Sequence, residues 1–277
     1  MSSYQSIPAL LKRYGLKPQK GLGQNFLSDP GSLQKVIRAA DIQPEDTVLE
    51  IGPGLGSLTH LIAQAASRVI AVELDIHLVG ALEDILQPYP HVELIQADIL
   101  EVNLNKLFSR PGYLVVANIP YYITSALLRQ LLEAEHPPAR LVLTIQKEVA
   151  ERICAEAGDL SLLALSVQVY GQPEIIDTIP AGAFYPVPNV DSAVVRVEIF
   201  PEPRIPREHL DMFFSLIKAG FSQKRKTITN AISAGMRWDK GETAALLVRS
   251  SLDPKRRAQT LSLEEWKRLV EVAVTTV

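Results

Sequence analysis

The sequence predicts an α/β fold, with a parallel sheet covered by helices on both faces and a small all-helical region after it. Short apolar, β-rich runs alternate with helical patterns from about residue 30 to residue 200. This alternation is typical of right-handed βαβ units. Most of the strand-like runs are rich in apolar residues, as expected for strands buried on both faces. Beyond residue 202 only helical patterns follow.

The predicted elements follow one another without long gaps. Asp29 and Pro30 form a cap and first-turn pair for a helix in "DPGSLQKVIRAADI". Further helices are predicted in "SLTHLIAQAA", "HLVGALEDIL", "SALLRQLLEA" and "KEVAERICAEA". Strands are predicted in "DTVLEIG", "RVIAVELD", "HVELIQAD", "YLVVAN", "RLVLTIQ", "PEIIDTI" and "SAVVRVEIF". "LSLLALSVQVYG" fits a buried helix or a strand, and we favour a helix, whereas "PAGAFYPVPNVD" is too rich in Pro and Gly to be regular.

A Pro-broken segment, "FPEPRIPREHL", predicts a domain boundary near residue 202. We expect one domain over residues 1–202, with an N-terminal arm over 1–28, and a helical domain over 203–277. Helices are predicted there in "REHLDMFFSLIKAGF", "TITNAISAGM", "GETAALLV" and "SLEEWKRLVEVAV". Ser262 and Glu265 have the spacing of a capping box at the start of the last one.

Composition excludes several classes of protein. Of the 277 residues 47% are hydrophobic, which is enough for one large core and a small second domain. The single cysteine, Cys154, excludes an intramolecular disulfide, and no histidine pair has a metal-ligand spacing, so we expect no metal site. The N-terminus lacks a signal-peptide core and no apolar run reaches membrane-spanning length, so we expect a cytoplasmic protein.

The loop "EIGPGLGS", which contains Gly52, joins the first strand of the predicted sheet to a helix. Its spacing differs from the dinucleotide fingerprint, and it lacks the Walker lysine. Glu73 ends the second strand, where a carboxylate can accept both hydroxyls of a ribose. Asp98 ends the third, where it could accept from an adenine amino group or simply cap the next segment. These strand ends meet in one crevice, and they favour S-adenosylmethionine over NAD because nothing there suits a pyrophosphate.

The fourth strand ends in "NIPYY", whose residues suit methylation of an exocyclic amine. Such an amine is a poor nucleophile because its lone pair is delocalised into the ring. Fixed oxygens that accept its hydrogens can stabilise the charge that develops. The Asn118 carboxamide is one acceptor, and the carbonyl of Ile119, which Pro120 restricts, is another. Tyr121 offers a face on which a base can stack, whereas Tyr122 fits simple packing equally well.

A base reaches such a site only when it is unpaired or flipped out of its stack, and it is then expected between two flat side chains. Phe184, just before two prolines and the last strand, is our candidate for the opposite face. The alternative is that Phe184 fills the core.

Eight motifs occur in an order that resembles one family. They are "GLGQNFL", "EIGPGLGSLT", "AVELD", "ADIL", "NIPYYITS", "QKEVAERI", "FYPVPNVDSAVV" and "FSQKRKT". Together they resemble the 16S ribosomal RNA adenine N6,N6-dimethyltransferases, whose loss gives kasugamycin resistance. One segment departs from the family pattern, because Ala157 stands where a tyrosine is usual.

The resemblance implies a Rossmann-like seven-stranded methyltransferase sheet with one antiparallel strand, and a small helical C-terminal domain. It implies dimethylation of N6 of two adjacent adenosines in the 3′-terminal hairpin loop of 16S rRNA, with S-adenosylmethionine as cofactor and a role in small-subunit biogenesis. It also implies that a "GQNF" segment closes over the cofactor. The implied cofactor-binding residues are Gln24, Asn25, Leu27, Gly52, Glu73, Asp98 and Asn118.

Local basic clusters offset a net charge of −3. Any one of them is by default a solvated surface. Together with an adenosine site they predict a surface that follows RNA phosphates. The predicted RNA-binding residues are Lys224, Arg225, Lys226 and Arg256. The expected partner is 16S rRNA in a 30S precursor, with no membrane contact, and we expect a monomer because no oligomer seam is visible.

Two other classes of function compete with this enzyme. One is a ribosome-assembly factor that keeps the fold without activity, which the presence of Glu73, Asp98, Asn118 and Tyr121 disfavours. The other is a related 23S rRNA or DNA adenine methyltransferase, which "FSQKRKT" and the C-terminal helices disfavour.

Overall fold

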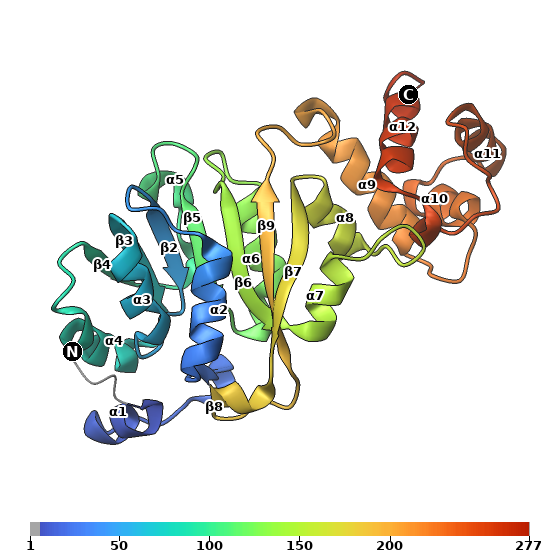
Figure 1. The fold of residues 1–277 in the computed structure, drawn as a ribbon. Helices are drawn as coiled ribbons and strands as arrows, with labels where there is room; N and C mark the ends of the chain where they lie inside the picture. The colour runs from blue at the N-terminus through green and yellow to red at the C-terminus, as the bar shows by residue number, and fades with distance from the viewer. Residues whose placement is uncertain (1–5, 277) are drawn as a thin grey trace. The chain divides into compact units, whose positions relative to one another are not determined.

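The structure, a computed structural model that describes residues 6–276, is built around a seven-stranded sheet (Figure 1). Its strands lie in the order β4, β3, β2, β5, β6, β9, β7. Their bounds are β2 Thr47–Ile51, β3 Arg68–Glu73, β4 Val92–Gln96, β5 Leu114–Asn118, β6 Arg140–Gln146, β7 Gly171–Ile179 and β9 Ser192–Ile199. Strands β2 to β6 pair in parallel, and β9 is antiparallel to β6. The predicted sheet and its one antiparallel strand are therefore confirmed.

Helices cover the sheet on both faces, so successive residues of a central strand are buried. Val48 and Leu49 of β2 point to opposite faces and neither is exposed. In Figure 1, α2 and α3 lie in front of the sheet and α6 behind it. The helices among the strands are α2 Pro30–Ala40, α3 Ser57–Ala65, α4 Ile76–Leu86, α5 Leu104–Leu107, α6 Thr124–Leu132 and α7 Lys147–Ile153. As predicted, Asp29 caps α2 by accepting from the backbone N–H of Ser32 at 2.7 Å.

The strand order reverses next to β2. The chain runs outward from β2 to β3 and β4 and then returns to place β5 on the other side of β2. The loops that leave β2 and β5 therefore diverge, and a crevice opens at the carboxyl ends of these strands.

An N-terminal arm crosses this edge of the sheet before α2 begins. It contains helix α1 (Ile7–Arg13), the 3₁₀ turn η1 (Lys20–Leu22) and the short strand β1 (Phe26–Leu27). Helix α1 packs its apolar residues against α4. Strand β1 pairs antiparallel with β8 (Phe184–Tyr185), so the arm is anchored at both ends. The segment around β8 was predicted to be irregular, and this short pairing is the regular structure that the prediction missed.

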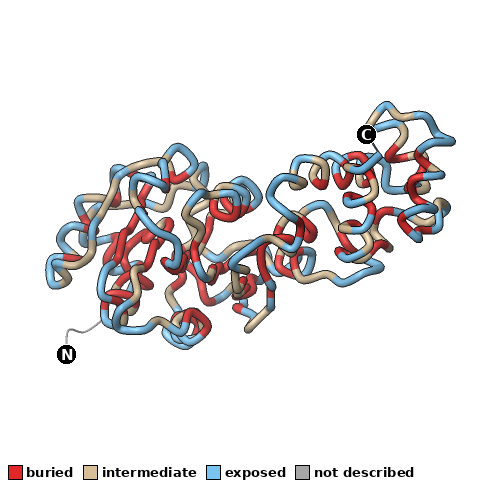
Figure 2. The backbone as a smooth tube through the Cα atoms, turned by 90° about the horizontal axis from the view of Figure 1, so that it is seen from above, coloured by how far each residue is buried: buried red, intermediate tan, exposed pale blue. Residues whose placement is uncertain are grey.

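Contacts divide the chain into two units, each with buried residues of its own (Figure 2). The first comprises the described parts of Met1–Ala150 and Glu174–Ile199, and the second those of Glu151–Pro173 and Phe200–Val277. The predicted division at residue 202 differs in one respect, because 151–173 groups with the helical unit.

The second unit is helical, as predicted. Its helices are α8 Leu162–Gln168, α9 Leu210–Phe221, α10 Ile228–Met236, α11 Lys240–Arg249 and α12 Leu263–Val274. It also contains the 3₁₀ turns η5 Arg207–His209 and η6 Ala258–Thr260, whereas η2 Ile99–Glu101, η3 Tyr121–Ile123 and η4 Ala181–Ala183 belong to the first unit. The helix favoured in "LSLLALSVQVYG" is confirmed as α8, and the capping box of Ser262 and Glu265 is present. A Cβ on Gly235 would lie 2.5 Å from that of Ala219, so glycine allows α10 to approach α9 closely. Within residues 6–276, no helix has both the length and the apolar character that crossing a membrane demands.

Candidate active site

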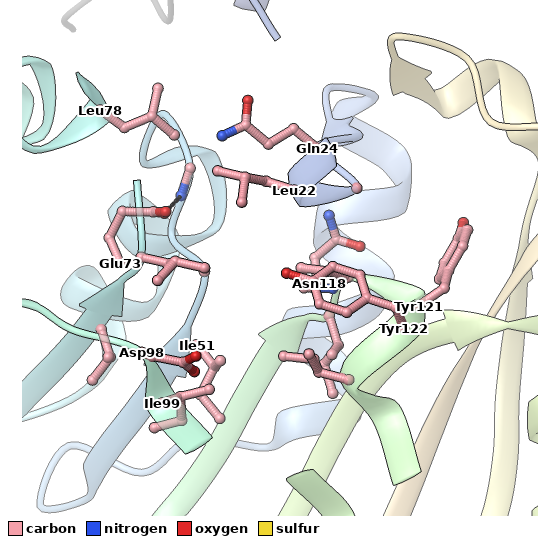
Figure 3. Close-up of a pocket in the computed structure, with 18 of the residues that line it drawn as sticks. Leu22, Gln24, Ile51, Glu73, Leu78, Asp98, Ile99, Asn118, Tyr121 and Tyr122 are labelled. Carbon is pink, nitrogen blue, oxygen red and sulfur yellow. Dashed lines mark hydrogen bonds between the residues drawn. The ribbon is translucent and has the colours of Figure 1, made fainter. Parts of the chain in front are cut away.

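A cavity opens at the carboxyl ends of the central strands, at the reversal of strand order (Figure 3). Glu73 of β3 and Asp98 after β4 lie on one side of it. Asn118 at the end of β5 lies on the other side, together with Tyr121 and Tyr122. Residues 22–26 of the arm complete the lining. Four strand ends and the arm thus meet in one place, as the sequence predicted for the strands.

The glycine loop forms the floor because its backbone adopts conformations that other residues disfavour. Gly52 and Gly54 both line the cavity, with φ of 68° and 63°. The N–H of Gly54 donates to Glu73 Oε2 at 3.1 Å. A Cβ on Gly54 would lie 2.8 Å from the ring of Phe26, so the arm rests directly on this loop.

The Glu73 carboxylate is buried and fixed by backbone donors. Its Oε2 accepts from Gly54, and its Oε1 accepts from the N–H of Asp75 at 2.8 Å. Burial raises the pKa of Glu73 despite these hydrogen bonds. Each oxygen retains a second lone pair, so this carboxylate can accept ribose hydroxyls without moving.

Asp98 caps the next segment and also faces the cavity. Its Oδ1 accepts from the N–H of Leu100 at 2.9 Å, which caps the 3₁₀ turn η2. The residue also lines the cavity. The cap fixes the side chain, and the second carboxylate oxygen is left to accept from a ligand.

The Asn118 carboxamide is oriented by the arm. Its Nδ2 donates to the backbone carbonyl of Asn25 at 2.9 Å, and its Oδ1 accepts no hydrogen bond from the described residues. The N–H of Ile119 donates to the carbonyl of Thr144 at 3.2 Å, whereas its own carbonyl accepts no such bond. Two oxygens are thus available as acceptors at the end of β5, which is what methylation of an amine requires.

The two tyrosines differ in how they are held. The hydroxyl of Tyr121 lies 2.9 Å from Ser192 Oγ in β9, and burial raises the pKa of Tyr121. Tyr122 is 61% exposed although it lines the cavity, so it is not a packing residue. Both rings are therefore placed where a base could contact them.

Two predicted site residues lie in the core instead of the cavity. Phe184 is only 2% exposed and belongs to the apolar cluster under α2 and α3, so the prediction that its ring stacks on a base is wrong for this structure. Leu27, its partner in the β1–β8 pairing, is buried in the same cluster and does not line the cavity. Pairing across the two short strands turns both side chains inward.

Gln24 lines the cavity, but its carboxamide is already bonded within the protein. Its Nε2 donates to Asp75 Oδ2 at 2.7 Å, and its Oε1 accepts from the N–H of Gln19 at 2.7 Å. Both polar groups of this carboxamide are therefore engaged by Gln19 of the arm and by Asp75, which precedes α4, and a direct contact of Gln24 with a cofactor stays a prediction.

The basic residues of the second unit fall into two groups. Lys224, Arg225 and Lys226 are exposed. Arg256, in contrast, forms an ion pair with Glu265 at 2.5 Å and also bonds Thr260, so its predicted role in binding RNA is corrected to a structural one.

Sequence reasoning missed the apolar walls of the cavity. Leu74, Ile99 and Leu100 follow the two acidic strand ends and line it. They look like core residues in the sequence, and only their neighbours Glu73 and Asp98 could have indicated their place. Asp75 was also missed, although its position before α4 is that of a helix cap.

Comparisons with known proteins give consistent results. The model of the family described as ribosomal RNA adenine dimethylase matches residues 15–274. The chain is 47% identical over 262 residues to a ribosomal RNA small subunit methyltransferase A of Dehalococcoides mccartyi (strain CBDB1), covering 94% of this chain and 90% of the relative. It is 38% identical to that of Geobacillus kaustophilus, covering 94% and 92%. Among solved structures, a dimethyladenosine transferase from Plasmodium falciparum has a TM-score of 0.76 at 26% identity, covering 91% and 98%. The 23S rRNA methyltransferase ErmE has a TM-score of 0.73 at 28% identity, covering 90% and 99%.

Proposed function

Because the chain belongs to the ribosomal RNA adenine dimethylase family, we propose that it dimethylates N6 of two adjacent adenosines in the 3′-terminal hairpin loop of 16S rRNA. One observation carries the proposal for this chain. A single cavity has acidic residues suited to an adenosyl methyl donor on one side and two amine-accepting oxygens with two tyrosines on the other.

S-Adenosylmethionine is the proposed donor, and when bound it supplies an electrophilic methyl group. The Glu73 carboxylate would accept the ribose hydroxyls, and Asp98 would accept from the adenine amino group. Leu74, Ile99 and Leu100 offer apolar contact to the adenine ring. Gly52 and Asn25 complete the cradle. Leu27 supports this cradle only through its strand pairing.

The acceptor half of the site prepares the adenine amine for attack. Asn118 Oδ1 and the Ile119 carbonyl would accept its two hydrogens, which localises the lone pair and stabilises the positive charge that forms on nitrogen. No strong base is needed, since the methylated amine is acidic enough to lose its proton to water. The same two oxygens can serve the second transfer, in which only one hydrogen remains to be held.

A flipped adenine needs a flat surface as well as acceptors. Tyr121, fixed at its hydroxyl by Ser192, is the proposed platform. Tyr122 is the proposed second aromatic contact, in place of the buried Phe184. Each stacking contact on a base is worth about 1–3 kcal/mol.

The second unit is proposed to hold the rRNA. Lys224, Arg225 and Lys226 are exposed, and Lys224 lines a cavity of this unit together with Arg152 and Lys218. Phosphates can approach such a surface without displacing an internal partner. The proposed substrate is a 30S precursor bound by a monomer, which fits the cytoplasmic location expected from the sequence.

A labelling experiment tests this function. The protein is incubated with methyl-labelled donor and, separately, unmethylated 30S subunits, 50S precursor RNA and DNA. We expect label only in 30S subunits, as N6,N6-dimethyladenosine at two adjacent positions. The likeness to ErmE makes 23S rRNA the second candidate, and label confined to 50S RNA would replace the first proposal with it. No label in any substrate would favour the assembly-factor function.

A further inference from the structure

The arm is fastened beside the cavity by a group of hydrogen bonds around one buried carboxylate. Asp75 is 5% exposed, and its Oδ2 accepts from Gln19 Nε2 at 2.8 Å and from Gln24 Nε2 at 2.7 Å. The Gln24 Oε1 atom accepts from the N–H of Gln19 at 2.7 Å, which closes the group. We call Gln19, Gln24 and Asp75 the arm clasp.

The arm clasp touches both halves of the active site. On the donor side, the N–H of Asp75 donates to Glu73 Oε1 at 2.8 Å. On the acceptor side, Gln24 is followed directly by Asn25. The backbone carbonyl of Asn25 accepts a hydrogen bond from Asn118 Nδ2 at 2.9 Å. A continuous path of hydrogen bonds and one peptide link therefore joins Glu73, the proposed acceptor of the ribose hydroxyls, to Asn118, the proposed acceptor of the adenine amine.

The arm clasp can loosen without releasing the whole arm. Upstream, α1 is packed against α4. Downstream, β1 is paired with β8, and the N–H groups of Ser28 and Asp29 both donate to the carbonyl of Ala183 at 2.9 and 3.1 Å. Loss of the clasp would therefore free only the segment of about Gln19 to Asn25.

We propose that the arm clasp positions the acceptor oxygen of Asn118, so that Gln24 and Asp75 are positioning residues for methyl transfer. An amide group can turn by 180° and exchange its oxygen with its nitrogen. The carbonyl of Asn25 fixes one orientation because it can only accept, and the clasp fixes Asn25. Without the clasp, the Asn118 carboxamide can turn its NH₂ group toward the substrate amine. The amine then has no oxygen at this position to which it can donate. This inference rests on the proposed function, since it concerns the same site.

A charge-exchange pair of substitutions tests the proposal. Gln24→Glu places a carboxylate against that of Asp75, and the two repel. Asp75→Asn removes the charge that holds both glutamines, while asparagine still caps α4 well. In the double variant the new carboxylate at position 24 can accept from the new amide at position 75, which restores the bond with its polarity reversed. Gln87→Glu, at an exposed residue of the first unit, is the matched control for added charge.

The kinetic readout is the split between kcat and the KM for the donor on 30S subunits. Each single variant should lower kcat about tenfold, with a smaller change in KM, and the double variant should recover most of it. Gln87→Glu should match the wild type. Unchanged kcat in the singles, or a double as impaired as the product of the singles, would overturn the proposal.

A second readout does not depend on activity. Amide hydrogen exchange across residues 19–25 should speed up in each single variant and return toward the wild-type rate in the double, with the unfolding temperature unchanged. Faster exchange throughout the protein would mean a general loss of stability and would also overturn the proposal. If the wild type transfers no methyl group to any RNA, the proposed function fails. The exchange pattern still shows whether the arm clasp holds residues 19–25 in place.

Discussion

The Asn118 carboxamide has one hydrogen-bond partner in the protein and one polar atom left for a ligand. Its nitrogen donates to the arm, and this leaves the oxygen to accept from a substrate amine. The side chain is suited to this position because it carries a donor and an acceptor on one rigid group. An aspartate would lose the donor, and an alanine would lose both.

Asn118→Ala should therefore abolish most methyl transfer while the donor still binds. We expect kcat to fall by about 10²–10³, the cost of removing one fixed group that stabilises developing charge. Binding of the donor should weaken much less, because Glu73 and the glycine loop remain. Single-turnover labelling and a donor titration measure the two effects. Retained turnover would show that another group orients the amine.

Glu50 is a buried carboxyl that the proposed chemistry does not use. Burial raises the pKa of Glu50 to about 8, and the charge of Glu73 adds to the rise. Its Oε2 has no hydrogen-bond partner among the described residues. Between the ordinary pKa of 4.5 and about 8 the folded protein holds a proton that the unfolded chain lacks. Stability should therefore fall as pH rises through this window, by at most about 1.4 kcal/mol per pH unit.

Glu50→Gln should remove this part of the pH dependence. The variant should gain stability relative to the wild type as pH rises from about 5 to about 8, because glutamine carries no charge to bury. Urea unfolding of both proteins across this range measures the difference. Glu73 is present in both proteins, so the two curves differ only through Glu50 and its electrostatic coupling to Glu73. Two parallel curves would contradict the raised pKa.

At the scale of elements, the ion pair of Arg256 fastens the start of α12. Glu265 belongs to the capping box of this helix, and Arg256 contacts both of its carboxylate oxygens, at 2.5 and 3.0 Å. The pair joins the helix to the loop before it, which also carries the exposed Lys255 and Arg257. One basic cluster in the sequence thus contains a structural arginine between two solvated cations.

Arg256→Ala should destabilise the protein by about 1.5–3 kcal/mol, the usual value for hydrogen bonds to a charged group. Lys255→Ala is the matched control and should change stability by less than about 0.5 kcal/mol. Chemical denaturation separates them. Binding of 30S subunits should respond in the opposite order, weakening with Lys255→Ala once stability is accounted for. Equal stabilities of the two variants would refute the structural role.

At the scale of the whole molecule, the cavity and its reactive groups lie in the first unit, whereas the exposed run Lys224, Arg225 and Lys226 lies in the second. The net charge of −3 hides this division, since acidic residues elsewhere offset the local clusters. Long-range attraction of RNA should therefore depend on the distribution of charge more than on its total.

Replacing Lys224, Arg225 and Lys226 with glutamine should weaken binding to 30S subunits and flatten its salt dependence. The slope of log affinity against log salt should drop by about 0.7–0.9 for each phosphate that the protein no longer neutralises. Donor affinity should be unchanged, because these residues lie outside the first unit. Filter binding over a range of salt concentrations measures the slope. An unaltered slope would place the RNA elsewhere.

Much of the fold and site follows from local patterns in the sequence. Apolar runs of strand length, the Asp29 cap and the Ser262 capping box act within a few residues, so their outcome does not depend on distant chain. The crevice follows from the order of elements, since carboxyl ends of parallel strands share one edge. Asn118 and Glu73 line the cavity because each ends a strand.

Tertiary structure alone decided which way several side chains face and what they bind. Phe184 and Leu27 turn into the core because β1 pairs with β8, a segment far along the chain, as the 155-residue separation of Ser28 from Ala183 illustrates. Gln24 meets Asp75 across 51 residues, and 151–173 joins the helical unit through contacts that no local pattern encodes. The sequence by itself determined the elements, their order and the chemistry at strand ends. The partners of each side chain required the folded chain, because pairing between distant residues is a property of packing.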